Sequence, residues 1–284
     1  MLGIKVRGAQ LYYETHGVGQ PLVLIPGFGA GAWMWFKQVP TLSQKFRAIV
    51  FDPRGIGRSS KPEQFFSIGT LADDLAALLD ALDLERAHIL GASFGGFVAQ
   101  EFALAYPQRT DRLILCCTSF GGARHLAPNE RVLRALASTE GLNTPERVRK
   151  SLLLSFSPRY LAEQTEEVER MIALRLTHPV SDEVYSGQLH TAMAFDAEAR
   201  VGQIDAPTLV ITGDADRVVP ADNSRNLAAA IPRARLTVIA GGSHQFFVER
   251  ADEFNRAVCD FLKEADEPEC SPLQTHEQFI EQDA

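Results

Sequence analysis

One serine has the surroundings that a catalytic nucleophile needs. In "HILGASFGG" (88–96) an apolar run ends in Gly-x-Ser-x-Gly, with Ser93 at its centre, and a helix-like stretch follows at once. A sharp turn between a strand and a helix lifts a hydroxyl above a sheet, and flanking glycines remove side chains that would collide there. The motif occurs by chance elsewhere, but its position between a predicted strand and a predicted helix favours a nucleophilic serine.

A serine hydroxyl needs a base to accept its proton and a third group to orient that base. Of the seven histidines, His244 is favoured because it lies in a glycine-bounded loop, "GGSHQFF" (241–247), after the last predicted strand. The third group is expected in "GDADRVVP" (213–220), after another strand. There we favour Asp216 as the acid and expect Asp214 to shape the turn.

A further carboxylate, Asp52, also ends a predicted strand. Its neighbours in "FDPRGIGRSS" (51–60) are typical of a hydrogen-bonded turn. We therefore expect Asp52 to brace the serine turn rather than to act as the acid.

Two backbone amides are expected to complete the site. Acyl transfer develops negative charge on an oxygen, and each N–H group aimed at that oxygen contributes about 10²–10³ to turnover. Phe94, directly after the serine, supplies one amide, and Phe28 in "PGFGAG" (26–31) supplies the other. We expect no metal and no cofactor.

The segments around these residues predict an α/β fold with a mostly parallel, eight-stranded sheet covered by helices on both faces. Nearly continuous apolar runs indicate strands that are buried on both sides. Six such runs are "LVLIPG" (22–27), "AIVFD" (48–52), "AHILG" (87–91), "RLILCC" (112–117), "TLVITGD" (208–214) and "LTVIAG" (236–241). The opening segment 4–17 alternates like an antiparallel hairpin at the sheet edge.

The alternation of strands and helices is interrupted once. Residues 121–199 contain helical patterns and no convincing strand, which predicts a helical cap over a core made of residues 1–120 and 200–265. A separate helical domain is the alternative. Residues 266–284 are polar, acidic and aperiodic, and we expect a disordered tail.

Composition narrows the location and the partners. A net charge of −8 disfavours nucleic acid and anionic membranes as partners, and no run approaches the roughly 20 apolar residues of a membrane span. The four cysteines (116, 117, 259 and 270) lack metal-ligand spacing and suit reduced thiols, which favours the cytoplasm. The N-terminus lacks the apolar core of a secretory signal. We expect a monomer or a homodimer.

Taken together, the motifs "PGFG", "DPRGIGRS", "GASFGG", "GDADRVVP" and "GGSHQFFVE", in this order, resemble the α/β-hydrolase superfamily up to about residue 264. The resemblance implies a Ser93–Asp216–His244 triad, oxyanion amides at Phe28 and Phe94, and a cap that governs substrate choice. Many members have histidine where this chain has Pro26, which cannot supply the side-chain hydrogen bonds that hold the loop. Within the superfamily the chain resembles small carboxylesterases and enzymes like 3-oxoadipate enol-lactonase.

The leading hypothesis is a cofactor-independent serine hydrolase that cleaves a small carboxylic ester or a lactone through an acyl-enzyme. Alternatives are hydrolysis of a carbon–carbon bond in a diketone-like ring-cleavage product, perhydrolase or haloperoxidase-like activity at the same triad, and a ligand receptor on a hydrolase fold. Five apolar cap residues are candidates for the substrate pocket: Leu152, Phe156, Met171, Leu174 and Met193.

Overall fold

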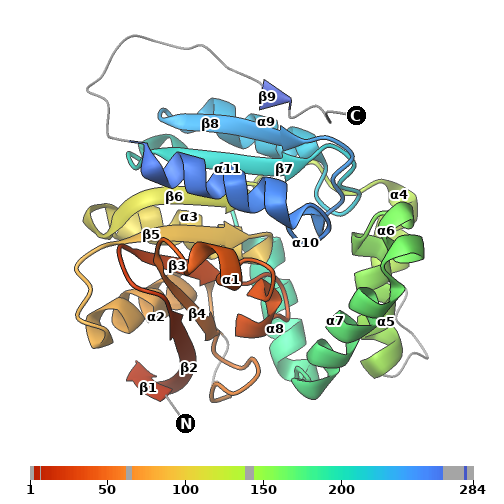
Figure 1. Cartoon of the computed structure of the whole chain (residues 1–284), viewed down its shortest axis with the longest axis horizontal. Coiled ribbons are helices and arrows are strands. Elements are labelled where there is room, and N and C mark those ends of the chain that lie inside the picture. Colours follow the sequence, from red (N-terminus) through yellow and green to blue (C-terminus); the bar gives the residue numbers. More distant parts are fainter. Residues whose placement is uncertain (1–2, 7, 62–65, 138–143, 265–277, 280–284) are drawn as a thin grey trace.

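The six apolar segments form parallel strands at the centre of one sheet (Figure 1). The computed structural model describes residues 3–6, 8–61, 66–137, 144–264 and 278–279. The strands are β1 (Gly3–Val6), β2 (Ala9–His16), β3 (Pro21–Ile25), β4 (Arg47–Asp52), β5 (Ala87–Ala92), β6 (Thr110–Cys116), β7 (Thr208–Gly213), β8 (Ala234–Ile239) and β9 (Gln278–Phe279). Their order is β1-β2-β4-β3-β5-β6-β7-β8-β9, and β1 and β2 form the predicted antiparallel edge. The predicted eight-stranded α/β sheet is confirmed, and β9 extends it by one short strand.

Side chains that alternate along the central strands supply two separate hydrophobic cores. On β3, Leu22 and Leu24 face one core, whereas Val23 and Ile25 face the other. The first core includes residues of α1 (Val39–Leu42), α10 (Phe246–Glu249) and α11 (Ala251–Lys263). The second includes residues of α2 (Ile68–Ala81), α3 (Phe94–Ala105) and α9 (Ala221–Ala230). Short 3₁₀ helices are η1 (Ala32–Trp35), η2 (Pro107–Arg109) and η3 (Val201–Gln203).

Among the described residues, five α-helices lie between β6 and β7 along the chain and gather beside the sheet (Figure 1). They are α4 (Glu130–Ala137), α5 (Thr144–Ser155), α6 (Pro158–Glu163), α7 (Thr165–Thr177) and α8 (Asp182–Ala194). An isolated antiparallel bridge between Gly121 and Asp196 joins the two ends of this segment. The helices occupy the predicted cap segment, and we call α4–α8 the cap; the exact domain limits stay a prediction.

The C-terminal segment departs from the prediction at two residues. Most of the predicted disordered tail, 266–284, lies outside the described residues. Gln278 and Phe279 are described, and they pair with Thr237 and Val238 of β8 as the strand β9. This pairing is a correction to the prediction of a tail without structure.

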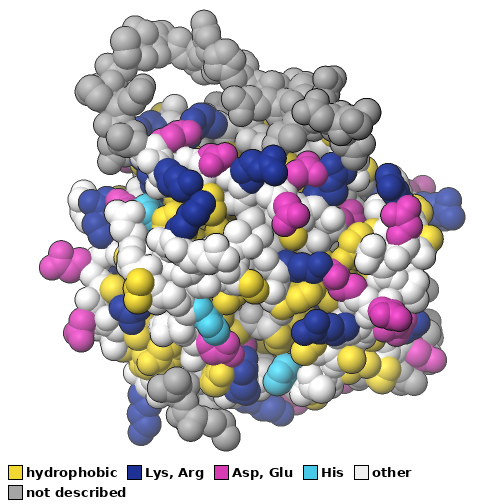
Figure 2. Space-filling view, viewed as in Figure 1, with side chains coloured by type: hydrophobic (Ala, Val, Ile, Leu, Met, Phe, Trp, Pro, Cys, Tyr) yellow, Lys and Arg dark blue, Asp and Glu magenta, His cyan; other side chains and the backbone are white. Residues whose placement is uncertain are grey.

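The charge of the surface, the hydropathy of the helices and the state of the cysteines relate to the predicted partners and location. On the face that Figure 2 shows, Lys and Arg side chains are interspersed with Asp and Glu. Within the described ranges, none of the helices combines the length and the hydropathy that crossing a bilayer requires. Cys116, Cys117 and Cys259 are buried free thiols, and Cys270 lies outside the described residues.

The contact between β5 and α3 leaves no room for a side chain at Gly91. A Cβ there would lie 2.3 Å from the carbonyl oxygen of Gly95 and 2.7 Å from the Cβ of Ala99. We expect Gly91→Ala to lower the free energy of unfolding by about 3 kcal/mol, because α3 must move away from the sheet. Urea unfolding measures this loss.

Gly69→Ala in α2 is the matched control, because its Cβ would meet only the Ser67 hydroxyl, at 3.5 Å. There we expect unchanged or slightly higher stability, by about 0.5 kcal/mol. Equal effects of the two substitutions would contradict the close packing of α3 on β5.

Candidate active site

Ser93 occupies the turn between β5 and α3, as its motif predicts. Its backbone has φ 53° and ψ −118°, and such positive φ values cost a residue other than glycine about 1–3 kcal/mol. Two bonds hold this conformation: the Ser93 amide donates to the carbonyl of Cys116, and the Thr118 hydroxyl donates to the Ser93 carbonyl, both at 2.8 Å. A Cβ on Gly95 would lie 2.3 Å from the carbonyl oxygen of Ile25, so only glycine permits this approach. The serine is therefore fixed by its surroundings.

Three side chains from loops far apart in the sequence meet beside this turn. His244 Nε2 lies 3.1 Å from Ser93 Oγ, and His244 Nδ1 lies 2.7 Å from Asp216 Oδ2. The other oxygen of Asp216 accepts the amides of Val218 and Val219, each at 2.8 Å. These two amides direct the carboxylate toward the imidazole. The geometry is that of a nucleophile, a base and an orienting acid.

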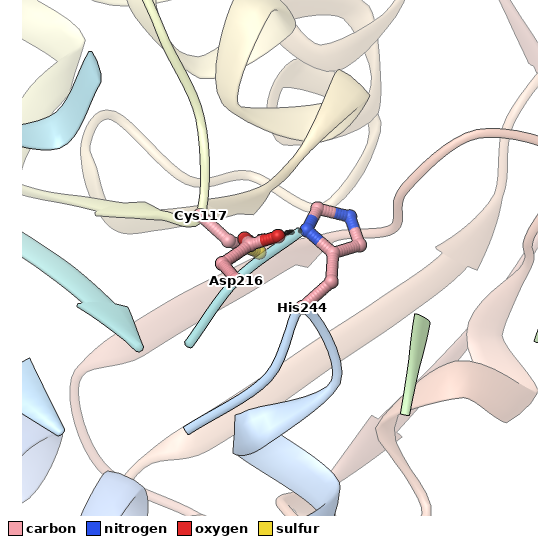
Figure 3. Close-up of side chains that lie close together, drawn as sticks. All are labelled: Cys117, Asp216 and His244. Atoms are coloured by element: carbon pink, nitrogen blue, oxygen red, sulfur yellow. Dashed lines mark hydrogen bonds and ion pairs between the residues drawn. The ribbon is translucent and has the colours of Figure 1, made fainter. Parts of the chain in front are cut away.

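A thiol also lies against the histidine and the aspartate. Figure 3 shows Cys117, at the end of β6, beside Asp216 and His244, and ligand-type atoms of the three lie within 4.8 Å of one another. Residues of these types bind zinc, but two ligands of a tetrahedral zinc lie roughly 3.3 Å apart. The 2.7 Å between His244 and Asp216 is a hydrogen-bond distance instead. The arrangement therefore fits a hydrogen-bonded pair better than a metal site.

Burial and charge act in opposite directions on the imidazole. Burial by itself lowers the pKa of His244, but the adjacent Asp216 carboxylate raises it, and the net pKa lies well above its ordinary value. Burial likewise raises the pKa of the Cys117 thiol well above its usual range. The thiol is therefore neutral near pH 7, and the carboxylate is the charge that stabilises an imidazolium.

The oxyanion loop, residues 26–30, passes over the serine. A Cβ on Gly27 would be 3.6 Å from the Cβ of Ser93. Three amides of the loop have acceptors: Gly27 N donates to Met34 Sδ (3.2 Å), Gly29 N to Gln188 Oε1 (2.8 Å) and Ala30 N to the carbonyl of Gly27 (3.2 Å). Among the described residues, Phe28 N has no acceptor. Phe94 is the first residue of α3, so its amide has no partner within the helix.

The two free amides therefore remain the candidates for the oxyanion hole. The rings of Phe28 and Phe94 contact each other edge to face, with their centroids 6.0 Å apart. This contact keeps the oxyanion loop close to the N-terminus of α3.

Two further carboxylates make structural hydrogen bonds. Asp52 is fully buried, and it accepts the amides of Ala32 (2.8 Å) and Arg58 (3.0 Å), so it ties β4 to the start of η1 and to the loop that contains Arg58. Asp214 accepts the amide of Gly241 at 2.7 Å and links the acid loop to the histidine loop.

The five candidate pocket residues lie in different environments. Leu152, Phe156 and Met171 are almost fully buried within the core cluster that the cap shares with the sheet. Leu174 is half-buried. Met193 is 81% exposed, which corrects its assignment to a pocket: its position on α8 directs it to solvent. The pocket stays a prediction for the other four.

Three residues that contact the site were not predicted from the sequence. Cys117 could have been found, because it ends a predicted strand at the same sheet edge as Ser93 and Asp216. No sequence pattern marks Gln188 or Arg175 as a residue of the site, because each is an ordinary polar residue of a cap helix. Gln188 accepts the amide of Gly29, and Arg175 Nη2 donates to the carbonyl of Phe28 at 3.3 Å.

We expect Asp216→Asn to lower the pKa of His244, because the substitution removes the charge that favours the imidazolium. Since the folded-state pKa exceeds the unfolded value, the wild-type histidine stabilises the fold below about pH 6.5, and this contribution is lost as the pH rises through the folded-state pKa. NMR titration of the imidazole measures the shift. Asp214→Asn serves as the control and leaves the titration unchanged; an equal shift in both variants would contradict the assignment of Asp216.

Comparison with known proteins identifies the family of this chain. The family model of the alpha/beta hydrolase fold matches residues 20–251. A RutD-type carbamate hydrolase of Azorhizobium caulinodans is 34% identical over 260 residues, which span 91% of this chain and 97% of that protein. The 2-hydroxy-6-oxo-6-phenylhexa-2,4-dienoate hydrolase of Comamonas testosteroni is 31% identical over 266 residues, 89% of this chain and 91% of that protein.

The solved structures lead to the same family. The enol-lactonase from Burkholderia xenovorans LB400 superimposes with a TM-score of 0.82 at 30% identity, over 93% of this chain and all of that one. The resemblance to the α/β-hydrolase superfamily seen in the sequence motifs is therefore confirmed. This chain belongs to the α/β-hydrolase family and is a hydrolase of that fold.

Proposed function

We propose that this protein is a cofactor-independent serine hydrolase that cleaves a small carboxylic ester or a lactone through an acyl-enzyme. One observation supports this most directly: Ser93 Oγ, His244 and Asp216 form a continuous chain of contacts at 3.1 and 2.7 Å. A serine hydroxyl without such a base is a poor nucleophile at neutral pH. The proposal assigns the three residues the roles of nucleophile, base and orienting acid.

The proposed reaction uses the neutral imidazole, which is the form of His244 above its raised pKa. With its proton on Nδ1, His244 donates to Asp216, and its Nε2 accepts the proton of Ser93 as the serine oxygen attacks the substrate carbonyl. The amides of Phe28 and Phe94 stabilise the resulting oxyanion. His244 then gives its proton to the leaving alcohol, and water activated by the same nitrogen releases the acid and restores Ser93.

We expect Ser93→Ala to reduce the hydrolysis of short-chain 4-nitrophenyl esters by about 10⁴–10⁶-fold, because no other group supplies the nucleophile. Release of 4-nitrophenol measures the rate. The wild type is labelled stoichiometrically by a fluorophosphonate, and Ser93→Ala is not.

Ser119→Ala is the matched control, since Ser119 is also buried near the end of β6 but contacts His125 (3.0 Å) instead of His244. This variant keeps both the rate and the labelling. A folded Ser93→Ala protein with near wild-type turnover would overturn the proposed mechanism, and an unlabelled wild type would favour a ligand receptor.

A cap arginine favours a substrate that bears a carboxylate. Arg175 of α7 donates to the carbonyl of Phe28, and no carboxylate forms an ion pair with it among the residues that the structure describes. Burial lowers the pKa of its guanidinium, which reflects the cost of holding this charge away from water. An anionic group on the substrate would offset that cost. The dienoate hydrolase relative acts on such a carboxylate, which makes carbon–carbon bond hydrolysis the second candidate.

Two comparisons test the substrate class. Wild-type rates on an anionic ester, 4-nitrophenyl hemisuccinate, and on the neutral 4-nitrophenyl butyrate give a ratio of kcat/KM values. We expect Arg175→Gln to lower this ratio by about tenfold to a hundredfold, because a hydrogen bond to a charged group is worth about 1.5–3 kcal/mol. The ratio cancels any effect that is common to both esters. An unchanged ratio would exclude Arg175 from substrate recognition, and a faster reaction with a vinylogous diketone acid than with either ester would favour the carbon–carbon hydrolase.

A further inference from the structure

Two cap side chains hold opposite ends of a single peptide group in the oxyanion loop. The carbonyl of Phe28 and the amide of Gly29 belong to the same peptide unit. Arg175 of α7 donates to that carbonyl at 3.3 Å, and Gln188 of α8 accepts from that amide at 2.8 Å. Gln188 is only 1% exposed, so its amide group is held in place by packing.

The clamped peptide directly follows the amide that is free to meet an oxyanion. Gly29 has φ +61°, in the left-handed region. Glycine adopts positive φ values about as readily as negative ones. A peptide between Phe28 and such a glycine can rotate at low cost, and rotation would redirect the loop and the neighbouring amide of Phe28. Pro26 offers no side-chain hydrogen bond that could prevent this.

We infer that Gln188 is a positioning residue: by fixing the 28–29 peptide, it places the amide of Phe28 in the oxyanion hole. This inference rests on the proposed serine-hydrolase function. The cap then takes part in catalysis as well as in covering the site.

Other contacts of α8 support this view of the helix. The ring of Tyr185 packs edge to face on the ring of Phe28, with centroids 4.9 Å apart. Thr191 donates its hydroxyl to the carbonyl of Phe66 at 2.7 Å, which anchors the same helix to a different part of the core. Residues 185, 188 and 191 are three apart, so they lie along one face of α8. That face joins the cap to the oxyanion loop at one end and to the core at the other.

Gln188→Met tests the inference, because methionine has a similar length and cannot accept the amide hydrogen bond with comparable strength. With 4-nitrophenyl butyrate we expect kcat to fall about 10- to 100-fold with KM changed less than about threefold, since the oxyanion contact is made only in the transition state. The ratio of rates for an ester and its thionoester should also fall, because sulfur uses oxyanion donors poorly and therefore loses less when a donor is misplaced.

Thr191→Val is the matched control: it removes a buried hydrogen bond between the same helix and the core but does not touch the oxyanion loop. We expect both variants to lose similar thermal stability and only Gln188→Met to lose kcat. If Gln188→Met does not fold, Arg175→Met tests the other end of the same peptide, and it too should lower kcat and the ester-to-thionoester ratio on the neutral ester.

The outcomes separate this inference from the proposed function. Full activity of the Ser93→Ala variant would contradict the proposed serine mechanism itself. An inactive Ser93→Ala variant, together with a Gln188→Met enzyme whose kcat and thionoester ratio match those of Thr191→Val, overturns the role of Gln188 alone.

Discussion

The contact between Ser93 and His244 is the constraint on which the rest of the site depends. It requires a serine in a backbone conformation that L-residues avoid, and a histidine from a loop about 150 residues later. The turn exists because β5 and α3 pack with glycines at their closest points and because two hydrogen bonds hold the Ser93 peptide groups. Tight packing around one residue therefore offsets the local strain.

The loops at the carboxyl ends of the parallel strands are connected to one another. Asp214 joins the acid loop to the histidine loop, and Asp52 joins β4 to the start of η1 and to the loop that contains Arg58. The cap adds a further layer: Arg217, next to the acid, donates to the carbonyl of Phe156, and the amide of Gln245, next to the histidine, donates to the carbonyl of Ser155. One corner of the cap therefore contacts both loops that orient the imidazole.

The relatives of this chain carry names that refer to different substrates on one fold. A carbamate, a dienoate and an enol-lactone appear in the names of proteins about 30% identical to it. A triad and two amides can activate any of these carbonyl groups, so the core does not select the bond. Under the proposed function, selection comes from groups outside the triad, and we propose the half-buried charge of Arg175 in the cap as such a group.

The sequence by itself determined the sheet and the three side chains of the candidate triad. Both are encoded locally: apolar runs specify buried strands, and Ser93, Asp216 and His244 each stand in a short motif directly after a strand, where parallel topology brings strand ends together. The tertiary structure alone decided how the cap meets the site. Gly29 and Gln188 are 159 residues apart, and nothing near either residue marks the other as its partner. The exposure of Met193, the strand β9 and the place of Cys117 beside the histidine likewise depend on how distant segments pack, which local patterns do not record.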